Sequence, residues 1–230
     1  MKLIHKFKSL NFDNRLAKKV SYIILHYTAL PSIDESINFL CKEENKVSCH
    51  YIISQSGKIY NLVDEKKRAW HAGKSYWLEE KDLNSISIGI ELDFSPNHYN
   101  NKFSKLLIDA LIELIFYLKK KYKIDKNKIL AHSDIAPYRK IDPGEKFPWK
   151  KLYNLNLAYN PTKTKTFDLK KMKSWFKKNK IYKNEKKILI MLNIIGYDIS
   201  KSINNKYCYK ALLNNYRNRF LQKVKSKNLD

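Results

Sequence analysis

The sequence predicts an α/β protein in which a mixed central β-sheet is flanked by helices and followed by a small C-terminal three-helix domain. Two apolar, partly β-branched runs, VSYIILHY (20–27) and SISIGIELDF (85–94), are typical of strands. Segments between and after these runs have apolar residues at helical spacing, most clearly FSKLLIDALIELIFYLKKKY (103–122). After Trp149 only helical patterns follow. Strands that alternate with helices favour a layered α/β fold over a helix bundle.

The predicted elements of the first half follow one another at short intervals. The strand at 20–27 carries His26 near its end, and ESINFLCKE (35–43) predicts a short helix. Two apolar runs on either side of SQSGK predict a hairpin over residues 50–63. The strand at 85–94 alternates between apolar and small residues and ends in acids. These elements supply several strands and one helix to the predicted sheet layer.

The helix at 103–122 has the clearest amphipathic pattern of the chain. Its apolar side chains fall on one helical face, at positions 106, 107, 110, 111, 114, 115 and 118. KILAH (128–132) then predicts one more strand, which ends at His132. The apolar face of the helix is therefore expected to pack against the sheet.

A change of composition divides the chain into two predicted domains. NPTKTKT (160–166) is typical of a linker, so we expect a first domain at residues 1–159 and a second at 160–230. Three helical patterns follow in the second domain, at 168–180, 185–195 and about 204–222. Gly196 fits the C-cap of the second of these helices.

The chain is strongly basic, with 46 Lys and Arg against 22 Asp and Glu and a formal net charge of +24. Residues 151–230 carry 20 of those cations and only 4 of the acids. Such a charge fits a nucleic-acid-binding protein. The cations are mostly lysines scattered over helical patterns, however, and specific recognition of bases depends more on arginine. We therefore expect no specific nucleic-acid partner and interpret the charge as a solvated surface.

Targeting and redox signals are weak throughout the chain. No apolar run approaches the ~20 residues of a membrane-spanning helix, so no transmembrane segment is expected. The N-terminus has early lysines without the apolar stretch of a signal peptide and without a cysteine for a lipid anchor. Cys41, Cys49 and Cys208 lack C-x-x-C spacing and fit a reducing compartment. We expect a cytoplasmic monomer, with a periplasmic location as the alternative.

The segment ILAHSDIAPYRKIDPGEKFPW (129–149) concentrates charged and metal-binding side chains on a loop stiffened by prolines. Its prolines and glycine predict neither a helix nor a strand after the first residues. A catalytic zinc takes three protein ligands and keeps one position for water. His132 at a strand end and Asp142 ten residues later could supply two of them, and His26 at another strand end could supply the third. Each histidine alone could equally be a structural, hydrogen-bonded residue.

Two further residues fit the chemistry of a zinc hydrolase. Glu91 is an acid at the end of an apolar strand, where burial would raise its pKa into the range of a general base. Lys140 stands two residues before Asp142, so both side chains can face the same way, and its ammonium could stabilise an oxyanion. The alternatives are a solvated glutamate and one more surface lysine.

The same residues resemble a known family, the zinc-dependent N-acetylmuramoyl-L-alanine amidases of the amidase-2/peptidoglycan-recognition group, of the AmpD and AmiD type. The resemblance rests on blocks that run in the family's order and cover nearly all of residues 10–150: ILHYTA (24–29), VSCHYIIS (47–54), GKIYNLVDEKKRAWHAGKSYW (57–77), NSISIGIEL (84–92) and HSDIAPYRKIDPGEKFPW (132–149). It implies an amidase-2 fold with one zinc ion per chain. It also implies His26, His132 and Asp142 as ligands, Glu91 as the catalytic acid and base, and Lys140 as the transition-state stabiliser.

The resemblance further implies a substrate cleft beside AWHAG (69–73). Trp70 would supply an apolar wall, and Arg139 a cation for a carboxylate of the stem peptide. His71 would contact substrate or support the metal ligands. His50 is expected to be structural, and Cys49 should point to the opposite face of the strand.

The implied function is hydrolysis of the amide between N-acetylmuramic acid and L-alanine in peptidoglycan or anhydro-muropeptides, during cell-wall turnover or recycling. The alternatives are a non-catalytic peptidoglycan sensor and a basic nucleic-acid-binding protein. KILIMLNIIGYDI (187–199) and ALLNNYRNRF (211–220) resemble, more weakly, the peptidoglycan-binding module of AmiD-type enzymes. The usual Phe-Gln pair is missing, so this domain could instead be a degenerate packing partner. Every predicted ligand precedes residue 143, so a chain without residues 161–230 is expected to keep its zinc.

Overall fold

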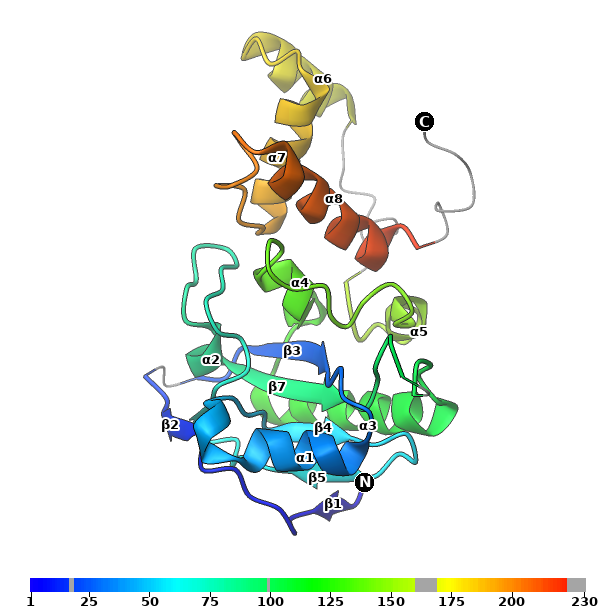
Figure 1. Ribbon diagram of the computed structural model, residues 1–230. Coiled ribbons are helices and arrows are strands. Elements are labelled where there is room, and N and C mark those ends of the chain that lie inside the picture. The colour runs from blue at the N-terminus through cyan, green and yellow to red at the C-terminus, as the bar shows by residue number, and fades with distance from the viewer. Residues whose placement is uncertain (17–18, 99, 160–168, 223–230) are drawn as a thin grey trace.

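The computed structural model describes residues 1–16, 19–98, 100–159 and 169–222. Its centre is a six-stranded sheet in the order β1-β5-β4-β7-β3-β8 (Figure 1). The strands are β1 (Leu3–Ile4), β5 (Ile59–Asn61), β4 (Tyr51–Ile53), β7 (Ser87–Leu92), β3 (Tyr22–Tyr27) and β8 (Ile129–Ala131). All neighbouring pairs are parallel except the β4–β5 hairpin. The predicted mixed sheet is confirmed.

One face of the sheet is covered by α3 (Lys105–Tyr122). Its buried leucines and isoleucines, among them Leu111 and Ile115, pack against Ile23, Leu25 and Ile90 of the central strands. The helix begins where Ser104 Oγ accepts the amide of Leu107 at 3.0 Å. Most of the apolar positions expected from the sequence face the sheet, but Leu106 is exposed and Ile108, which was not among them, is buried.

The other face of the sheet is covered by two groups of helices. The helix α1 (Ile33–Cys41) buries Ile37 and Leu40 against Ile52 and Leu62. The next strand positions on this face, Tyr22, Ile24 and Leu130, belong to a cluster that includes residues from the C-terminal helices. Successive side chains of a strand point to opposite faces, so Ile23 and Ile24 serve different layers.

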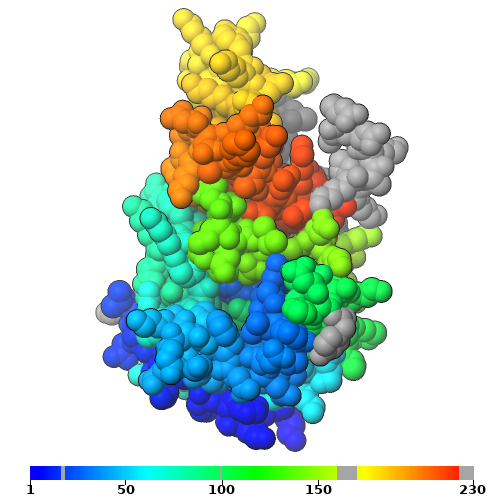
Figure 2. Space-filling view, in the orientation of Figure 1, coloured from blue at the N-terminus to red at the C-terminus, as the bar shows by residue number. Residues whose placement is uncertain are grey.

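The C-terminal helices are α6 (Leu169–Lys178), α7 (Asn184–Ile195) and α8 (Lys206–Phe220). Three helices were expected here, and Gly196 caps α7 as predicted, with its amide bonded to Leu192 and Asn193 carbonyls. Leu192, Tyr197 and Leu212 pack on Trp77 and on the sheet cluster. Figure 2 shows α7 and α8 lying directly against the loop segment 129–149, with α6 at the far end. The linker expected at 160–166 lies outside the described residues. The division into two domains stays a prediction.

Some elements differ from the sequence-based expectation. Residues 83–86 form a helical turn, α2 (Leu83–Ile86), so β7 begins only at Ser87. The segment 129–149 was expected to hold no helix, but it contains α4 (His132–Ile135) and the start of α5 (Trp149–Asn154). The turn of α4 forms because Asp134 accepts the amide of Ala131 at 2.7 Å. The short pair β2 (Phe12–Asn14) and β6 (Lys67–Ala69) was not anticipated.

In the described part of the chain, no helix combines the length and apolarity that crossing a bilayer requires. The longest, α3, carries charged residues beside its apolar ones, among them Asp109, Glu113 and three lysines in its last turn.

A buried ion pair fastens the C-terminal helices to the sheet domain. Arg219 Nη1 of α8 lies 2.6 Å from Asp134 Oδ2 of α4, and the two side chains are 3% and 0% exposed. The hydroxyl of Tyr197 donates to the other carboxylate oxygen of Asp134 at 2.6 Å. Removing the helices would expose Trp77 to solvent and would leave the Asp134 carboxylate without the Arg219 guanidinium that pairs with it. The helical segment is thus part of the fold around the loop. The expectation that a chain without residues 161–230 keeps its zinc stays a prediction.

Arg219→Met is therefore expected to lower the free energy of unfolding by about 3–5 kcal/mol, because it leaves a buried carboxylate uncompensated. Urea denaturation followed by circular dichroism measures this loss. Arg217→Met, an exposed neighbour on α8, serves as the control and should change stability by no more than about 0.5 kcal/mol. Adding Asp134→Asn to Arg219→Met should recover part of the loss. A stability of Arg219→Met equal to the control would contradict the role given to the ion pair.

Candidate metal centre and active site

Three neighbouring parallel strands end at the candidate site. His26 lies near the end of β3 and is in register with Glu91 of β7 on one side. On the other side Leu25 pairs with Ala131 of β8, and His132 follows directly. Carboxyl ends of parallel strands meet at one edge of a sheet, which brings these three side chains together although they are far apart in sequence. Asp142 joins them because its carbonyl accepts the amide of Ser133 at 3.0 Å, which folds the loop back onto α4.

His26, His132 and Asp142 form a compact triangle of metal-binding atoms. The Nδ1 atoms of the two histidines are 2.9 Å apart, and Asp142 Oδ2 lies 3.2 Å from His26 Nδ1 and 3.0 Å from His132 Nδ1. With metal–ligand bonds of about 2.0–2.1 Å, adjacent donors of a tetrahedral zinc stand roughly 3.3 Å apart. The three atoms therefore match one face of such a tetrahedron and leave its fourth corner free. All three residues are buried, and they are a group able to hold a metal ion.

The outer nitrogens of the two histidines are fixed by hydrogen bonds. His132 Nε2 lies 3.1 Å from the carbonyl oxygen of Ala72, so this nitrogen carries the proton and Nδ1 keeps its lone pair for a metal. His26 Nε2 lies 3.0 Å from His71 Nδ1, and His71 Nε2 lies 3.2 Å from Ser87 Oγ. Donation in that direction along the chain would again leave Nδ1 of His26 free as a ligand. Such partners hold ligating imidazoles in place and set their tautomer.

Gly89 makes room for this arrangement. A Cβ atom at Gly89 would stand only 2.3 Å from Cγ of His71, so any side chain there would displace the imidazole behind His26. The glycine in the middle of the strand SISIGIELDF is therefore explained by close approach of a ring to the backbone.

Charge and burial at the triangle favour the protonation states of metal ligands. Burial and the neighbouring His132 lower the pKa of His26 to about 4, so its imidazole is neutral near pH 7. Burial alone would raise the pKa of Asp142, but its contacts with His132 and His26 hold it well below its usual value. A neutral imidazole beside an ionised carboxylate fits a donor set typical of zinc.

Glu91 and Lys140 line the same cavity as the triangle, a space of about 340 Å³. Burial and the charge of Asp142 raise the pKa of Glu91 to about 8, although Lys140 opposes the shift. Oε2 of Glu91 is buried and has no hydrogen-bond partner among the described residues. A carboxylate held without a partner beside a metal site is suited to accept a proton from a bound molecule.

The three expected substrate residues occupy different places. Arg139 lines the cavity, and its Nη2 donates to the carbonyls of Ala72 and Lys74 at 2.8 and 2.9 Å. His71 reaches the cavity wall but is only 5% exposed, and its contacts with His26 and Ser87 favour the supporting role. Trp70 is not among the described residues that line this cavity.

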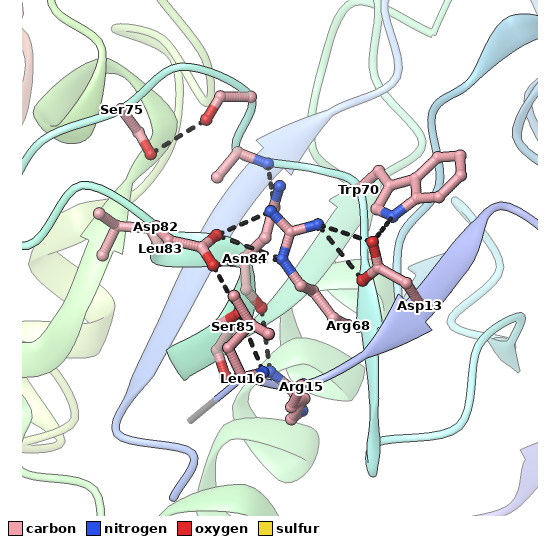
Figure 3. Close-up of polar contacts among 12 residues, drawn as sticks. Asp13, Arg15, Leu16, Arg68, Trp70, Ser75, Asp82, Leu83, Asn84 and Ser85 are labelled. Atoms are coloured by element: carbon pink, nitrogen blue, oxygen red, sulfur yellow. Dashed lines mark hydrogen bonds and ion pairs between the residues drawn. The ribbon is translucent and has the colours of Figure 1, made fainter. Parts of the chain in front are cut away.

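The position of Trp70 follows from a polar network on the β2–β6 side (Figure 3). Its Nε1 donates to Asp13 Oδ2 at 3.2 Å, and the same carboxylate pairs with Arg68. Arg68 in turn binds Asp82 at 2.8 Å. Trp70 is thus held against a surface ion-pair network, and its role as a wall of the substrate cleft stays a prediction.

Sequence reasoning missed the residues that hold the AWHAG segment in place. Asn84 Oδ1 accepts the amides of His71 and Ala72 at 3.1 and 2.8 Å, which positions the imidazole behind His26 and the carbonyl that fixes His132. His50 is buried as expected, and its Nδ1 accepts the amide of Gly89 at 3.0 Å. Asn84 begins the block NSISIGIEL, but only its contacts show what it does.

Comparisons with known proteins agree with the site. Residues 16–145 match the family model described as Amidase_2, N-acetylmuramoyl-L-alanine amidase. The chain is 38% identical over 147 residues to the N-acetylmuramoyl-L-alanine amidase AmiD of Escherichia coli (strain K12), an alignment that covers 58% of this chain and 52% of AmiD. It is 33% identical over 165 residues to the 1,6-anhydro-N-acetylmuramyl-L-alanine amidase AmpD of Haemophilus influenzae, which covers 64% of this chain and 88% of AmpD. The chain thus spans about half the length of the first of these relatives.

Solved structures show the same architecture. The E. coli amidase AmiD, in complex with the substrate anhydro-N-acetylmuramic acid-L-Ala-D-γ-Glu-L-Lys, superposes with a TM-score of 0.73 at 28% identity. That superposition covers 90% of this chain and 83% of AmiD. AmpDh3 of Pseudomonas aeruginosa, in complex with an anhydromuramic pentapeptide, gives a TM-score of 0.73 at 27% identity and covers 93% of this chain and 88% of AmpDh3. Both superpositions extend beyond the matched family region into the C-terminal helices.

Proposed function

Because the chain belongs to the Amidase_2 family of N-acetylmuramoyl-L-alanine amidases, we propose that it hydrolyses the amide between the lactyl group of N-acetylmuramic acid and L-alanine. The observation that supports this most directly is the triangle of His26, His132 and Asp142 with Glu91 facing the same cavity. The substrates named for the relatives in complexes are anhydromuropeptides, so a soluble muropeptide is the first substrate to test.

We infer that the ion is zinc, one per chain, held by His26 Nδ1, His132 Nδ1 and a carboxylate oxygen of Asp142. The donor set and the tetrahedral spacing support this choice. When bound, such an ion polarises the scissile carbonyl and lowers the pKa of water at its open position. All three proposed ligands are buried residues that line the cavity.

The remaining chemistry belongs to side chains of this chain. Glu91 takes a proton from the attacking water and then gives it to the nitrogen of the departing L-alanine. Lys140 lines the same cavity and stabilises the negative charge that develops on the carbonyl oxygen. Arg139 offers a cation to a carboxylate of the stem peptide.

The direct test is digestion of a defined anhydro-muropeptide and of intact sacculi, with products identified by mass spectrometry. Release of an intact stem peptide with a free L-alanine amine supports the proposal, and the ratio of the two rates gives the preference between soluble and polymeric substrate. The sensor alternative predicts binding without release. A sequence-preferring affinity for DNA that falls steeply with salt, without peptide release, would support the nucleic-acid alternative.

Lys140→Ala is expected to lower turnover by about 10²–10³-fold while zinc content stays at that of wild type. The reason is that Lys140 acts on charge that develops in the transition state and does not belong to the ligand triangle. Lys140→Arg should restore only part of the rate, since a planar guanidinium has another reach and shape. Lys146→Ala, an exposed lysine of the same loop, is the control. Equal turnover of Lys140→Ala and this control would contradict the assignment.

A further inference from the structure

The loop that carries Lys140 is held partly by its own backbone. The amides of Ala136 and Lys140 donate to the carbonyls of His132 and Ala136 at 2.9 and 3.0 Å. The backbone carbonyls of Pro137 and Lys140, in the same turn, accept hydrogen bonds from a side chain outside the loop. Both accept from Nδ2 of Asn215, at 2.9 and 3.0 Å.

Asn215 lies on α8, 75 residues after Lys140 in the chain, and is only 2% exposed. An amide NH₂ group has two hydrogens, and the two carbonyls use both of them. The side chain therefore ties Pro137 to Lys140 across the turn that presents Arg139 and Lys140. This turn lies between His132 and Asp142, so the tie acts on the loop at the metal triangle.

The helix α8 is anchored independently of Asn215. One turn further along, Arg219 pairs with Asp134, and its Nη2 donates to the carbonyl of Ile129 at 2.7 Å. Leu212 is buried in the cluster beneath α7. Loss of the Asn215 amide alone should thus free the turn at Lys140 while α8 stays in place.

We propose that Asn215 is a positioning residue for Lys140, so that the C-terminal helices complete the active site as well as the fold. The inference rests on the proposed role of Lys140 in amide hydrolysis. Asn215 does not line the cavity of the metal triangle, and its side-chain hydrogen bonds to the loop are made to backbone carbonyls. A displacement of a catalytic group by about 1 Å can lower a rate by ~10²-fold, so a tie of this kind has a measurable effect.

The test compares Asn215→Leu, which is close in size but has no donor, with Asn214→Leu, its exposed neighbour on α8. Each variant is also made in the Lys140→Ala background. Turnover, KM, zinc content, melting temperature and hydrogen exchange of the amides of residues 138–141 are measured on the full chain with one purified anhydro-muropeptide.

Asn215→Leu is expected to lower kcat by about 10–100-fold with KM changed by less than about threefold and zinc retained, and to speed exchange at 138–141. In the Lys140→Ala background the same substitution should have little further effect on kcat, because the group that it positions is gone. An equal factor in both backgrounds, or unchanged kcat and exchange, would overturn the proposal. If Asn215→Leu loses zinc or has a lowered melting temperature, Asn215→Ser is measured in the wild-type and Lys140→Ala backgrounds in its place.

The failure of this inference can be told from failure of the proposed function. If the wild type releases no stem peptide, the amidase proposal fails, and the exchange experiment still shows whether Asn215 holds the turn. If the wild type is active and Lys140→Ala is as active as wild type, the role of Lys140 fails and the inference with it. If the wild type is active and Lys140→Ala is impaired, but Asn215→Leu lowers kcat by the same factor in both backgrounds, only the inference about Asn215 fails.

Discussion

Replacing His26 or His132 by alanine, or Asp142 by alanine, is expected to remove zinc and amidase activity together. The three donor atoms lie within 3.2 Å of one another, so the loss of one leaves two ligands where a catalytic zinc takes three. Without the ion the reaction loses several kcal/mol of stabilisation, and each ~1.4 kcal/mol is tenfold in rate. Turnover should therefore fall by at least about 10³-fold.

Metal analysis of the purified variants, with turnover on one muropeptide, measures this effect. Wild type should hold about one zinc per chain, lose activity on chelation and recover it when zinc returns. The variants should not recover. His5→Ala, which replaces an exposed histidine far from the triangle in sequence, is the control and should behave as wild type. Full activity of thoroughly chelated, zinc-free wild type would refute the metal proposal.

The strand pattern placed the candidate ligands at strand ends, and the structure shows why they meet. His26, Glu91 and His132 each stand at or just after the end of a predicted strand, and parallel strands bring such ends to one edge. The return of Asp142 depends on a loop whose prolines and glycine were visible in the sequence. These signals are local, and they left each residue open to a structural role; the resemblance to the amidase family is what implied the full set.

What the sequence did not reveal depends on contacts between distant segments. The support of His26 by His71 requires that Gly89 leave space for the ring, and the strand pattern shows only an isolated glycine. The contact of Trp70 with Asp13 depends on the two-stranded pair β2–β6, whose three-residue strands are too short for a periodic signal. Short elements draw their stability from packing, which single-sequence patterns do not record.

The role of the C-terminal helices is a further case of this kind. Amphipathic spacing predicted the three helices, and each begins and ends within two residues of the expected bounds. Their partner surface could not be read from the same spacing. Asn215 and Arg219 occupy buried positions of α8 that look like polar interruptions of its pattern, and only the structure shows the loop carbonyls and the Asp134 carboxylate that they bind.

The pKa of Glu91 gives the site a pH dependence of stability whose sign can be worked out. In the metal-free folded protein this pKa is about 8, against an ordinary value of 4.5. Between these values the folded state keeps a proton that the unfolded state has released, so its stability falls as pH rises through that window. Glu91→Gln has no proton to lose there and should lack this part of the slope. Urea denaturation of both metal-free proteins at several pH values checks the difference.

Glu91→Gln is expected to lower turnover by about 10²–10⁴-fold, the range that a general acid and base contributes. Glutamine keeps the shape of the side chain but cannot accept the proton of the attacking water, and it is not one of the three ligands, so zinc should be retained. In wild type kcat/KM should rise with pH as Glu91 ionises, with a midpoint below about 8 because a bound cation favours the carboxylate. The residual activity of Glu91→Gln should lack that rise. Glu79→Gln, an exposed glutamate, is the control for loss of one negative charge. Zinc content and turnover are measured on the same preparations, and a Glu91→Gln protein within about threefold of wild type would exclude Glu91 as the base.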